Sequence, residues 1–144
     1  MSETRSLSGR CLCGAVRFTA IAHTEEAHAC HCGMCRKWAA GPFFGITCDG
    51  EISFEADDNL GVYVSSDWAE RGFCKICGSS LFWKLRGADH YALSAGALDD
   101  PGGLTLAREF YIDKKPSYYA LAGDRLRLTE ADVIKMFAPP QEQS

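Results

Sequence analysis

Seven of the eight cysteines in this sequence fall into three close groups. The groups are a C-x-C pair, a C-x-C-x-x-C cluster and a C-x-x-C pair, formed respectively by Cys11 and Cys13, by Cys30, Cys32 and Cys35, and by Cys74 and Cys77. Zinc takes four protein ligands in structural sites, whereas in catalytic sites it takes three and keeps one position open. The type and spacing of these cysteines therefore indicate metal–thiolate chemistry.

The first and last pairs resemble each other in sequence. CLCGAVRF begins at Cys11 and CKICGSSLF begins at Cys74, and in each a Gly directly follows the second cysteine. Gly permits the positive φ of a tight turn at little steric cost. If the two turns lie on adjacent strands, they present four sulfurs to one ion. We therefore predict a closed structural zinc site at Cys11, Cys13, Cys74 and Cys77, with iron as the alternative metal.

The middle cluster has three thiolates, which we place on a short loop. A zinc ion held by Cys30, Cys32 and Cys35 keeps a fourth position for water or a substrate. Two alternatives remain open: Cys48, His31 or His28 closes the site, or the cluster binds no metal permanently. We expect Cys48, on the predicted strand FFGITCDG, to be a buried apolar residue. We expect the side chain of His31, which lies between two ligands, to point away from the ion.

A zinc ion with three thiolates is suited to binding a further sulfur. Three negative ligands more than cancel the charge of Zn²⁺, so the ion is a weak Lewis acid towards water, yet it accepts soft thiolates readily. A substrate thiol bound there is held as thiolate below its free pKa of about 8.5. Addition of that thiolate to an aldehyde carbon forms a carbon–sulfur bond, and the reverse step breaks it.

Basic residues close to the cysteines favour an anionic thiol as the substrate. Arg36 and Lys37 directly follow the middle cluster, and Arg71 lies just before Cys74. Arg binds carboxylates in a bidentate way, and glutathione carries two of them. We predict that these three residues bind substrate, and solvated surface charge is the alternative for each. Three aromatic residues are candidates to line a pocket, with core packing as their alternative: Trp38, Phe43 and Phe44.

The rest of the chain reads as short strands. Seven segments rich in β-branched and aromatic residues are bounded by turn residues: 15–22, 41–50, 51–56, 61–66, 80–87, 90–98 and 107–113. DDPGG at 99–103 predicts a turn. Thr129, followed three residues later by Asp132, predicts the cap of a short helix that runs through Phe137. We expect a mainly β fold with a disordered tail at 138–144.

Length and composition indicate one globular domain spanning residues 1–144. Apolar residues make up 47% and charged residues 24% of the 144-residue chain. The net charge of −4 argues against nucleic acid or an anionic membrane surface as partner. The sequence has neither a bilayer-spanning apolar run nor a signal peptide, so we expect a cytoplasmic protein. Thiols stay reduced there, which favours metal ligands over disulfides.

Several cysteine-containing segments together resemble the glutathione-dependent formaldehyde-activating (GFA) family, which also includes centromere-protein-V-like domains. In order, the segments are GRCLCGAVRF, CHCGMCRKWAAGPF and RGFCKICGSSLFW, and the later REFYIDKKPSYYAL resembles the family's final strand. The resemblance covers roughly residues 8–122. It implies a fold similar to the Mss-four-like zinc-binding fold, which is built from several antiparallel β-sheets.

The resemblance also implies two zinc ions per chain. One is structural, at the four cysteines of the paired turns, and the other is catalytic, at Cys30, Cys32 and Cys35. The implied activity is the condensation of formaldehyde with glutathione to S-(hydroxymethyl)glutathione, classed as a carbon–sulfur lyase reaction in the reverse sense.

We therefore predict a zinc-dependent carbon–sulfur lyase that acts on a small-molecule thiol and a small aldehyde. The alternatives are a non-catalytic zinc-binding module that carries glutathione or docks a protein partner, and a redox or thiol-carrier protein. In the redox alternative, the three cysteines of the middle cluster cycle through a disulfide.

Overall fold

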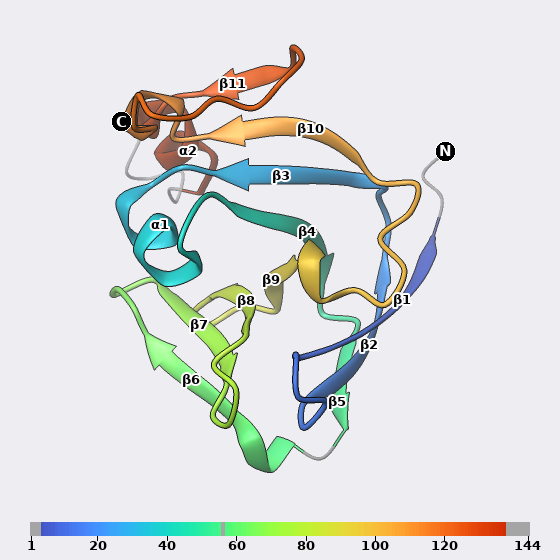
Figure 1. Ribbon diagram of the computed structural model, residues 1–144. Coiled ribbons are helices and arrows are strands. Elements are labelled where there is room, and N and C mark those ends of the chain that lie inside the picture. Colours follow the sequence, from blue (N-terminus) through green and yellow to red (C-terminus); the bar gives the residue numbers. More distant parts are fainter. Residues whose placement is uncertain (1–3, 56, 138–144) are drawn as a thin grey trace. The chain divides into compact units, whose positions relative to one another are not determined.

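The computed structural model describes residues 4–55 and 57–137, and the predicted disorder of 138–144 lies outside these residues (Figure 1). The chain divides into two compact units. Unit 1 comprises residues 1–27 and 44–105, and unit 2 comprises residues 28–43 and 106–144. The expectation of a single domain stays a prediction.

Unit 1 contains a three-stranded antiparallel sheet in the order β1-β2-β5. Its strands are β1 (Arg5–Arg10), β2 (Arg17–Ala22) and β5 (Ile52–Glu55). Side chains of β2 alternate strictly between exposed and buried, because successive residues of a strand point to opposite faces. Phe18, Ala20 and Ala22 therefore face the core, whereas Arg17 and Thr19 face solvent.

A second run of antiparallel strands in unit 1 has the order β4-β9-β8-β7-β6. The bounds are β4 (Phe43–Asp49), β6 (Leu60–Val64), β7 (Ala69–Cys74), β8 (Ser80–Leu85) and β9 (His90–Ser94), with short 3₁₀ turns η1 (Asp57–Asn59) and η2 (Ala95–Ala97). Val16, Ile46, Leu81 and Leu93 have no exposed surface and form the centre of the core. This core fixes the strands that carry the four-cysteine turns.

Unit 2 holds most of the remaining elements. They are β3 (Glu26–Cys30), α1 (Gly33–Ala39), β10 (Thr105–Phe110), the 3₁₀ turn η3 (Ile112–Lys114), β11 (Leu126–Leu128) and α2 (Glu130–Phe137). The first two residues of β3 and the first residue of β10 belong to unit 1, and Phe43, the first residue of β4, belongs to unit 2. The strand order is β11-β10-β3, and β10 pairs with β11 in parallel. Neither α-helix within residues 4–55 and 57–137 has the length and apolarity that a bilayer span needs.

The prediction of a mainly β fold is confirmed, and all seven predicted strand segments contain a strand. The sheets are not purely antiparallel, because β10 and β11 run in parallel. The helix cap is also confirmed. The backbone N–H of Asp132 donates to the Thr129 hydroxyl at 3.2 Å, and the N–H of Thr129 donates to the Asp132 carboxylate at 3.0 Å. This reciprocal pair is a capping box at the start of α2.

Candidate metal centres

The four-cysteine group lies entirely in unit 1 and is carried by two tight turns. One turn joins β1 to β2 and the other joins β7 to β8. Gly14 and Gly78, which follow Cys13 and Cys77, have φ of 82° and 81°, the left-handed conformation that a side chain would strain. The two turns are not on adjacent strands, because β1 and β7 belong to different sheets. The Leu12 N–H, which donates to the Ser79 hydroxyl at 3.0 Å, links them instead.

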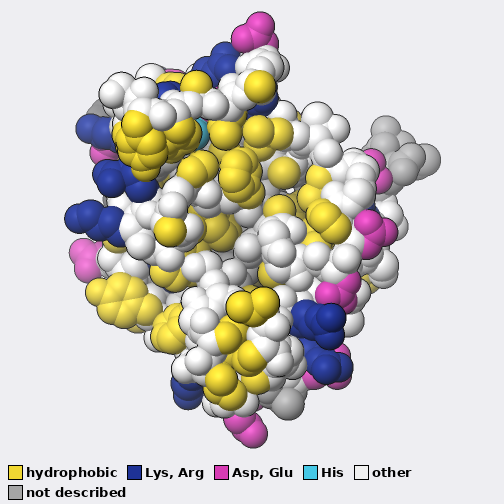
Figure 2. Space-filling model, in the orientation of Figure 1, with side chains coloured by type: hydrophobic (Ala, Val, Ile, Leu, Met, Phe, Trp, Pro, Cys, Tyr) yellow, Lys and Arg dark blue, Asp and Glu magenta, His cyan; other side chains and the backbone are white. Residues whose placement is uncertain are grey.

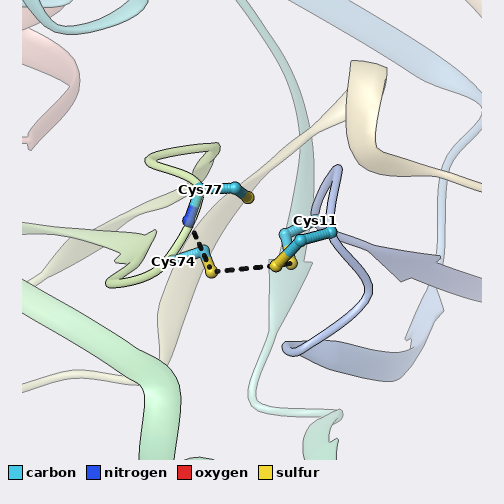
Figure 3. A group of neighbouring side chains, drawn as sticks. Cys11, Cys74 and Cys77 are labelled. Atoms are coloured by element: carbon cyan, nitrogen blue, oxygen red, sulfur yellow. Dashed lines mark hydrogen bonds between the residues drawn. The ribbon is translucent and has the colours of Figure 1, made fainter.

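The sulfurs of this group have the spacing of a metal site. All four lie within 4.8 Å of one another, and in Figure 3 the cysteines of the two turns face each other. The Cys13 sulfur is 3.6 Å from that of Cys11 and 3.8 Å from that of Cys74. A tetrahedral zinc ion with bonds of about 2.3 Å places its sulfurs about 3.8 Å apart. Disulfide sulfurs would be separated by only about 2.05 Å, so the geometry fits four ligands of one ion.

Backbone groups around Cys74 and Cys77 favour thiolates. The N–H groups of Ile76 and Cys77 point at the Cys74 sulfur, at 3.3 and 3.4 Å. The hydroxyl and backbone N–H of Ser79, together with the backbone of Cys13, lower the pKa of Cys77 to about 5. A thiolate is the form that binds a metal, so Cys77 is ready to bind near neutral pH.

The three-cysteine group lies entirely in unit 2, and its residues occupy a strand end, a helix N-cap and a helix. Cys30 ends β3, Cys32 is the N-cap of α1, and Cys35 lies in the first turns of that helix. The Cys32 sulfur accepts a hydrogen bond from the Cys35 N–H at 3.3 Å, which fixes the cap. The expectation of a short loop is therefore wrong in detail: a strand end and a helix start position the three side chains. Their sulfurs lie within 4.8 Å of one another.

The electrostatics of this second group fit a divalent cation. Hydrogen bonding with Cys32 and Cys35, followed by burial, raises the pKa of the Cys30 thiol. Three clustered thiols resist ionising together, because each thiolate repels the next. A bound divalent cation removes that repulsion, as it does wherever thiols ligate zinc.

Within residues 4–55 and 57–137, the ligand atoms that gather around this cluster belong to three cysteines alone. His31 lies between two of them, but its ring nitrogens face Glu109 and Tyr119 at 2.8 and 2.6 Å. Cys48 is buried in unit 1, where its thiol donates to the Ile21 carbonyl at 3.3 Å. The alternative in which His31 closes the cluster is therefore not supported, and closure by Cys48 stays a prediction.

The sequence profile described as glutathione-dependent formaldehyde-activating enzyme matches residues 6–114 of this chain. The chain belongs to this family. An uncharacterized lyase of Schizosaccharomyces pombe is 34% identical over 128 residues, which cover 88% of this chain and 93% of that protein. The GFA resemblance of the cysteine segments is thereby confirmed.

A second relative agrees with the GFA assignment, and one solved structure supports the fold. A Halomonas elongata protein, provisionally named a glutathione-dependent formaldehyde-activating enzyme, is 32% identical over 85 residues, which cover 53% of this chain and 54% of that protein. A crystal structure of a Rhodobacter sphaeroides protein has the same fold, with a TM-score of 0.57 and 23% identity, and the match covers 68% of this chain and 90% of that one.

The three basic residues that we predicted to bind substrate have different environments in this GFA-family chain. Arg36 lies on α1 beside the three-cysteine group, and its buried Nε has no hydrogen-bond partner among the described residues. Lys37 is exposed on the same helix. Arg71 is buried in β7 of unit 1, where its Nε donates to the Ser65 hydroxyl at 3.2 Å. Their substrate-binding roles stay predictions, and Arg36 has the environment best suited to an anion.

The aromatic candidates also separate. The rings of Trp38 and Phe43 contact each other in unit 2, with centroids 5.2 Å apart. Phe44 belongs to unit 1 and is 38% exposed. A pocket-lining role stays a prediction for all three.

Sequence reasoning did not identify Tyr111 as a residue of this centre. Tyr111 follows β10 with φ of 58° and ψ of 44°, a left-handed conformation that is uncommon outside glycine. Burial, followed by the charges of Cys32 and Cys30, raises the pKa of Tyr111 to about 12, so its hydroxyl stays protonated beside the cysteines. The strand-like segment AREFYID carries no signal for such a backbone.

Proposed function

We propose that this protein is a carbon–sulfur lyase that joins a glutathione-like thiol to a small aldehyde such as formaldehyde, or catalyses the reverse reaction. The family description, one relative named as a lyase and another named for glutathione-dependent formaldehyde activation support the reaction class. The observation that carries the proposal is a three-thiolate group without a fourth protein ligand in the described chain, separate from a complete four-thiolate group.

Cys30, Cys32 and Cys35 would hold one zinc ion, and Cys11, Cys13, Cys74 and Cys77 would hold another. When bound to the three-cysteine group, the metal supplies a site that keeps a substrate thiol ionised near neutral pH. In the overall reaction the thiol proton is released, sulfur bonds to the aldehyde carbon, and the carbonyl oxygen takes a proton from water. Protons and electrons balance, so no oxidant or reductant is needed.

The surroundings of α1 favour an anionic substrate. Figure 2 shows Lys and Arg side chains gathered over the end of unit 2 where Figure 1 places α1 and α2. Within that unit, the Nε of Arg36 is desolvated and unpartnered. A buried guanidinium N–H without an acceptor is costly, and a carboxylate would satisfy it through a charge-assisted hydrogen bond. We infer that Arg36 binds a carboxylate of the thiol substrate.

The test compares Cys32→Ser with Cys48→Ser by native mass spectrometry, with and without glutathione. Cys48→Ser is the matched control, since Cys48 belongs to neither metal group. We expect two zinc ions and a glutathione adduct in the parent and in Cys48→Ser, and one ion with no adduct in Cys32→Ser. A folded Cys32→Ser protein that keeps both ions and binds glutathione like the parent would show the proposal to be wrong.

A second measurement separates the lyase from the binding module. Formation of S-(hydroxymethyl)glutathione from formaldehyde also proceeds without an enzyme, so the rate with protein must be compared with the rate without it. NMR exchange spectroscopy measures both rates. The lyase should raise the exchange rate in proportion to protein concentration, and Cys32→Ser should not. A protein that binds glutathione without raising the rate is the carrier module instead.

A further inference from the structure

His31 is held at three points although it does not face the three-cysteine group. The residue has no exposed surface, and it lies in sequence between two of the cysteines. Its backbone N–H donates to the Phe110 carbonyl at 3.0 Å. Its ring contacts the Tyr119 hydroxyl through Nδ1 at 2.6 Å and the Glu109 carboxylate through Nε2 at 2.8 Å. All of these partners belong to unit 2.

Glu109 is a buried carboxylate whose charge is balanced. It lies on β10 and is 1% exposed. Arg125 donates to its second carboxylate oxygen, and the Nε of Arg127 donates to the same oxygen at 3.2 Å. Burial raises the pKa of Glu109, but hydrogen bonds from His31 and Arg125 outweigh burial and leave the pKa below its ordinary value. Glu109 is therefore ionised and can only accept hydrogen bonds.

An ionised Glu109 determines the direction of the remaining hydrogen bonds. The Nε2 of His31 must carry a hydrogen in order to donate to the carboxylate. A neutral ring then has its lone pair on Nδ1, which accepts the hydrogen of the Tyr119 hydroxyl. Every ring nitrogen is satisfied, so the ring is held in one orientation.

These contacts are tertiary and involve no cysteine side chain. Glu109 is 78 residues from His31 in sequence, and Tyr119 is 88 residues from it. A residue that is fixed through its backbone and at both ends of its ring also restricts the two peptide units beside it. Those peptide units belong to Cys30 and Cys32.

We propose that Glu109, acting through His31, is a positioning residue that keeps Cys30 and Cys32 in their metal-binding arrangement when the ion is absent. The inference rests on the three-cysteine metal site of the proposed function. By this inference, the three-cysteine centre releases and rebinds a thiophilic divalent cation while the backbone around the centre stays folded. Metal exchange at this centre is then separate from unfolding.

The test uses the full-length protein loaded with two zinc ions and a competing chelator. Native mass spectrometry gives the dissociation constant of each ion, and alkylation of released thiols identifies the emptied group. Glu109→Gln weakens the acceptor of His31, and Glu130→Gln, at a half-buried carboxylate that pairs with Lys114 in the same unit, is its control. Tyr119→Phe removes the hydrogen bond between the Tyr119 hydroxyl and Nδ1 of His31, and it leaves no buried charge unpaired. Its control is Tyr118→Phe, at a neighbouring residue that is 75% exposed.

We expect Glu109→Gln and Tyr119→Phe to raise the dissociation constant of the three-cysteine ion about tenfold or more, in the range found for groups that orient metal ligands. The four-cysteine ion should bind as in the parent, and both controls should match the parent. Equal dissociation constants in the parent, Glu109→Gln and Tyr119→Phe would overturn the inference. If Glu109→Gln fails to fold, the comparison of Tyr119→Phe with Tyr118→Phe decides alone.

Hydrogen exchange gives a readout that does not depend on the loaded centre. In parent protein with only the four-cysteine ion bound, the amides of residues 28–35 should stay protected, and Tyr119→Phe should lose that protection. Loss of protection in the parent itself would contradict the inference. A parent that never binds an ion at the three cysteines would instead contradict the proposed function, so the two failures are distinguishable.

Discussion

Arg36 and Lys37 are sequence neighbours on one helix, yet only Arg36 has a desolvated polar atom. A buried donor that meets a carboxylate gains a charge-assisted hydrogen bond, which contributes about 1.5–3 kcal/mol. An exposed ammonium contributes little, because water screens it. The difference between the two residues therefore predicts a difference in substrate binding.

We predict that Arg36→Gln raises the dissociation constant for glutathione about tenfold, whereas Lys37→Gln changes it less than twofold. Isothermal titration calorimetry on zinc-loaded protein measures both. A neutral thiol such as 2-mercaptoethanol should bind Arg36→Gln and the parent equally, since it has no carboxylate. Equal weakening for glutathione and the neutral thiol would mean that Arg36 supports the fold rather than the substrate.

Of all the residues in the candidate site, the metal ligands are the ones that the sequence predicts best. Cysteine spacing is local, and a tight turn or a helix start brings such neighbours together. The partners of His31 are not local, because Glu109 and Tyr119 reach it through tertiary packing. A Glu on a strand normally indicates a solvent-facing position, and nothing in its sequence shows that two arginines will balance it when it is buried.

The elements of the fold differ in how clearly sequence predicts them. The first four residues of β2, RFTA, alternate polar and apolar, and the predicted segment 15–22 ends where the strand ends, at Ala22. The sequence of β7, AERGFC, does not alternate between polar and apolar residues. Buried residues occur on both faces of this strand, so a regular alternation is not expected. α1 has seven residues, too few for a helical period to be distinguished from a loop. The helix was therefore missed although its cysteines were recognised.

The capping box of α2 gives a prediction at this scale. Thr129→Ala removes the acceptor of the Asp132 N–H and should lower the free energy of unfolding by about 1 kcal/mol. Urea denaturation monitored by circular dichroism measures the change. Ser117→Ala, at an exposed position of the same unit, is the control and should stay within about 0.5 kcal/mol of the parent. A Thr129→Ala protein as stable as this control would mean that the box does not stabilise the helix.

The same box makes the stability of α2 depend on pH. Hydrogen bonds from the backbone N–H and the hydroxyl of Thr129 lower the pKa of Asp132 from its ordinary value of 3.8. The contribution of the ionised carboxylate is therefore present above pH 3.8 and is lost as the pH falls through the lowered pKa. Denaturation series at several pH values should show this loss in the parent and not in Asp132→Asn. Parallel pH profiles for the two proteins would contradict the assignment.

At the scale of the whole molecule, the two cysteine groups belong to different compact units. The four-cysteine group joins turns that carry Cys13 and Cys74, 61 residues apart, in unit 1. The three-cysteine group lies within unit 2 and takes its ligands from a six-residue stretch, residues 30–35. A metal that closes a long loop contributes more to folding than one that closes a short loop, by about 2 kcal/mol for a tenfold difference in loop length.

Loss of the first metal should therefore unfold unit 1, whereas loss of the second should not. Structural zinc binding contributes about 10–16 kcal/mol in small metal domains, as much as the whole stability of a typical domain at about 5–15 kcal/mol. We predict that Cys74→Ser abolishes amide protection in β1, β2, β7 and β8, and that Cys32→Ser leaves it intact. Hydrogen exchange with mass spectrometry measures both, with Cys48→Ser as the control for a buried cysteine outside the metal groups. Protection of β1 and β2 in Cys74→Ser equal to that in Cys48→Ser would show that the core of unit 1 is stable without the ion.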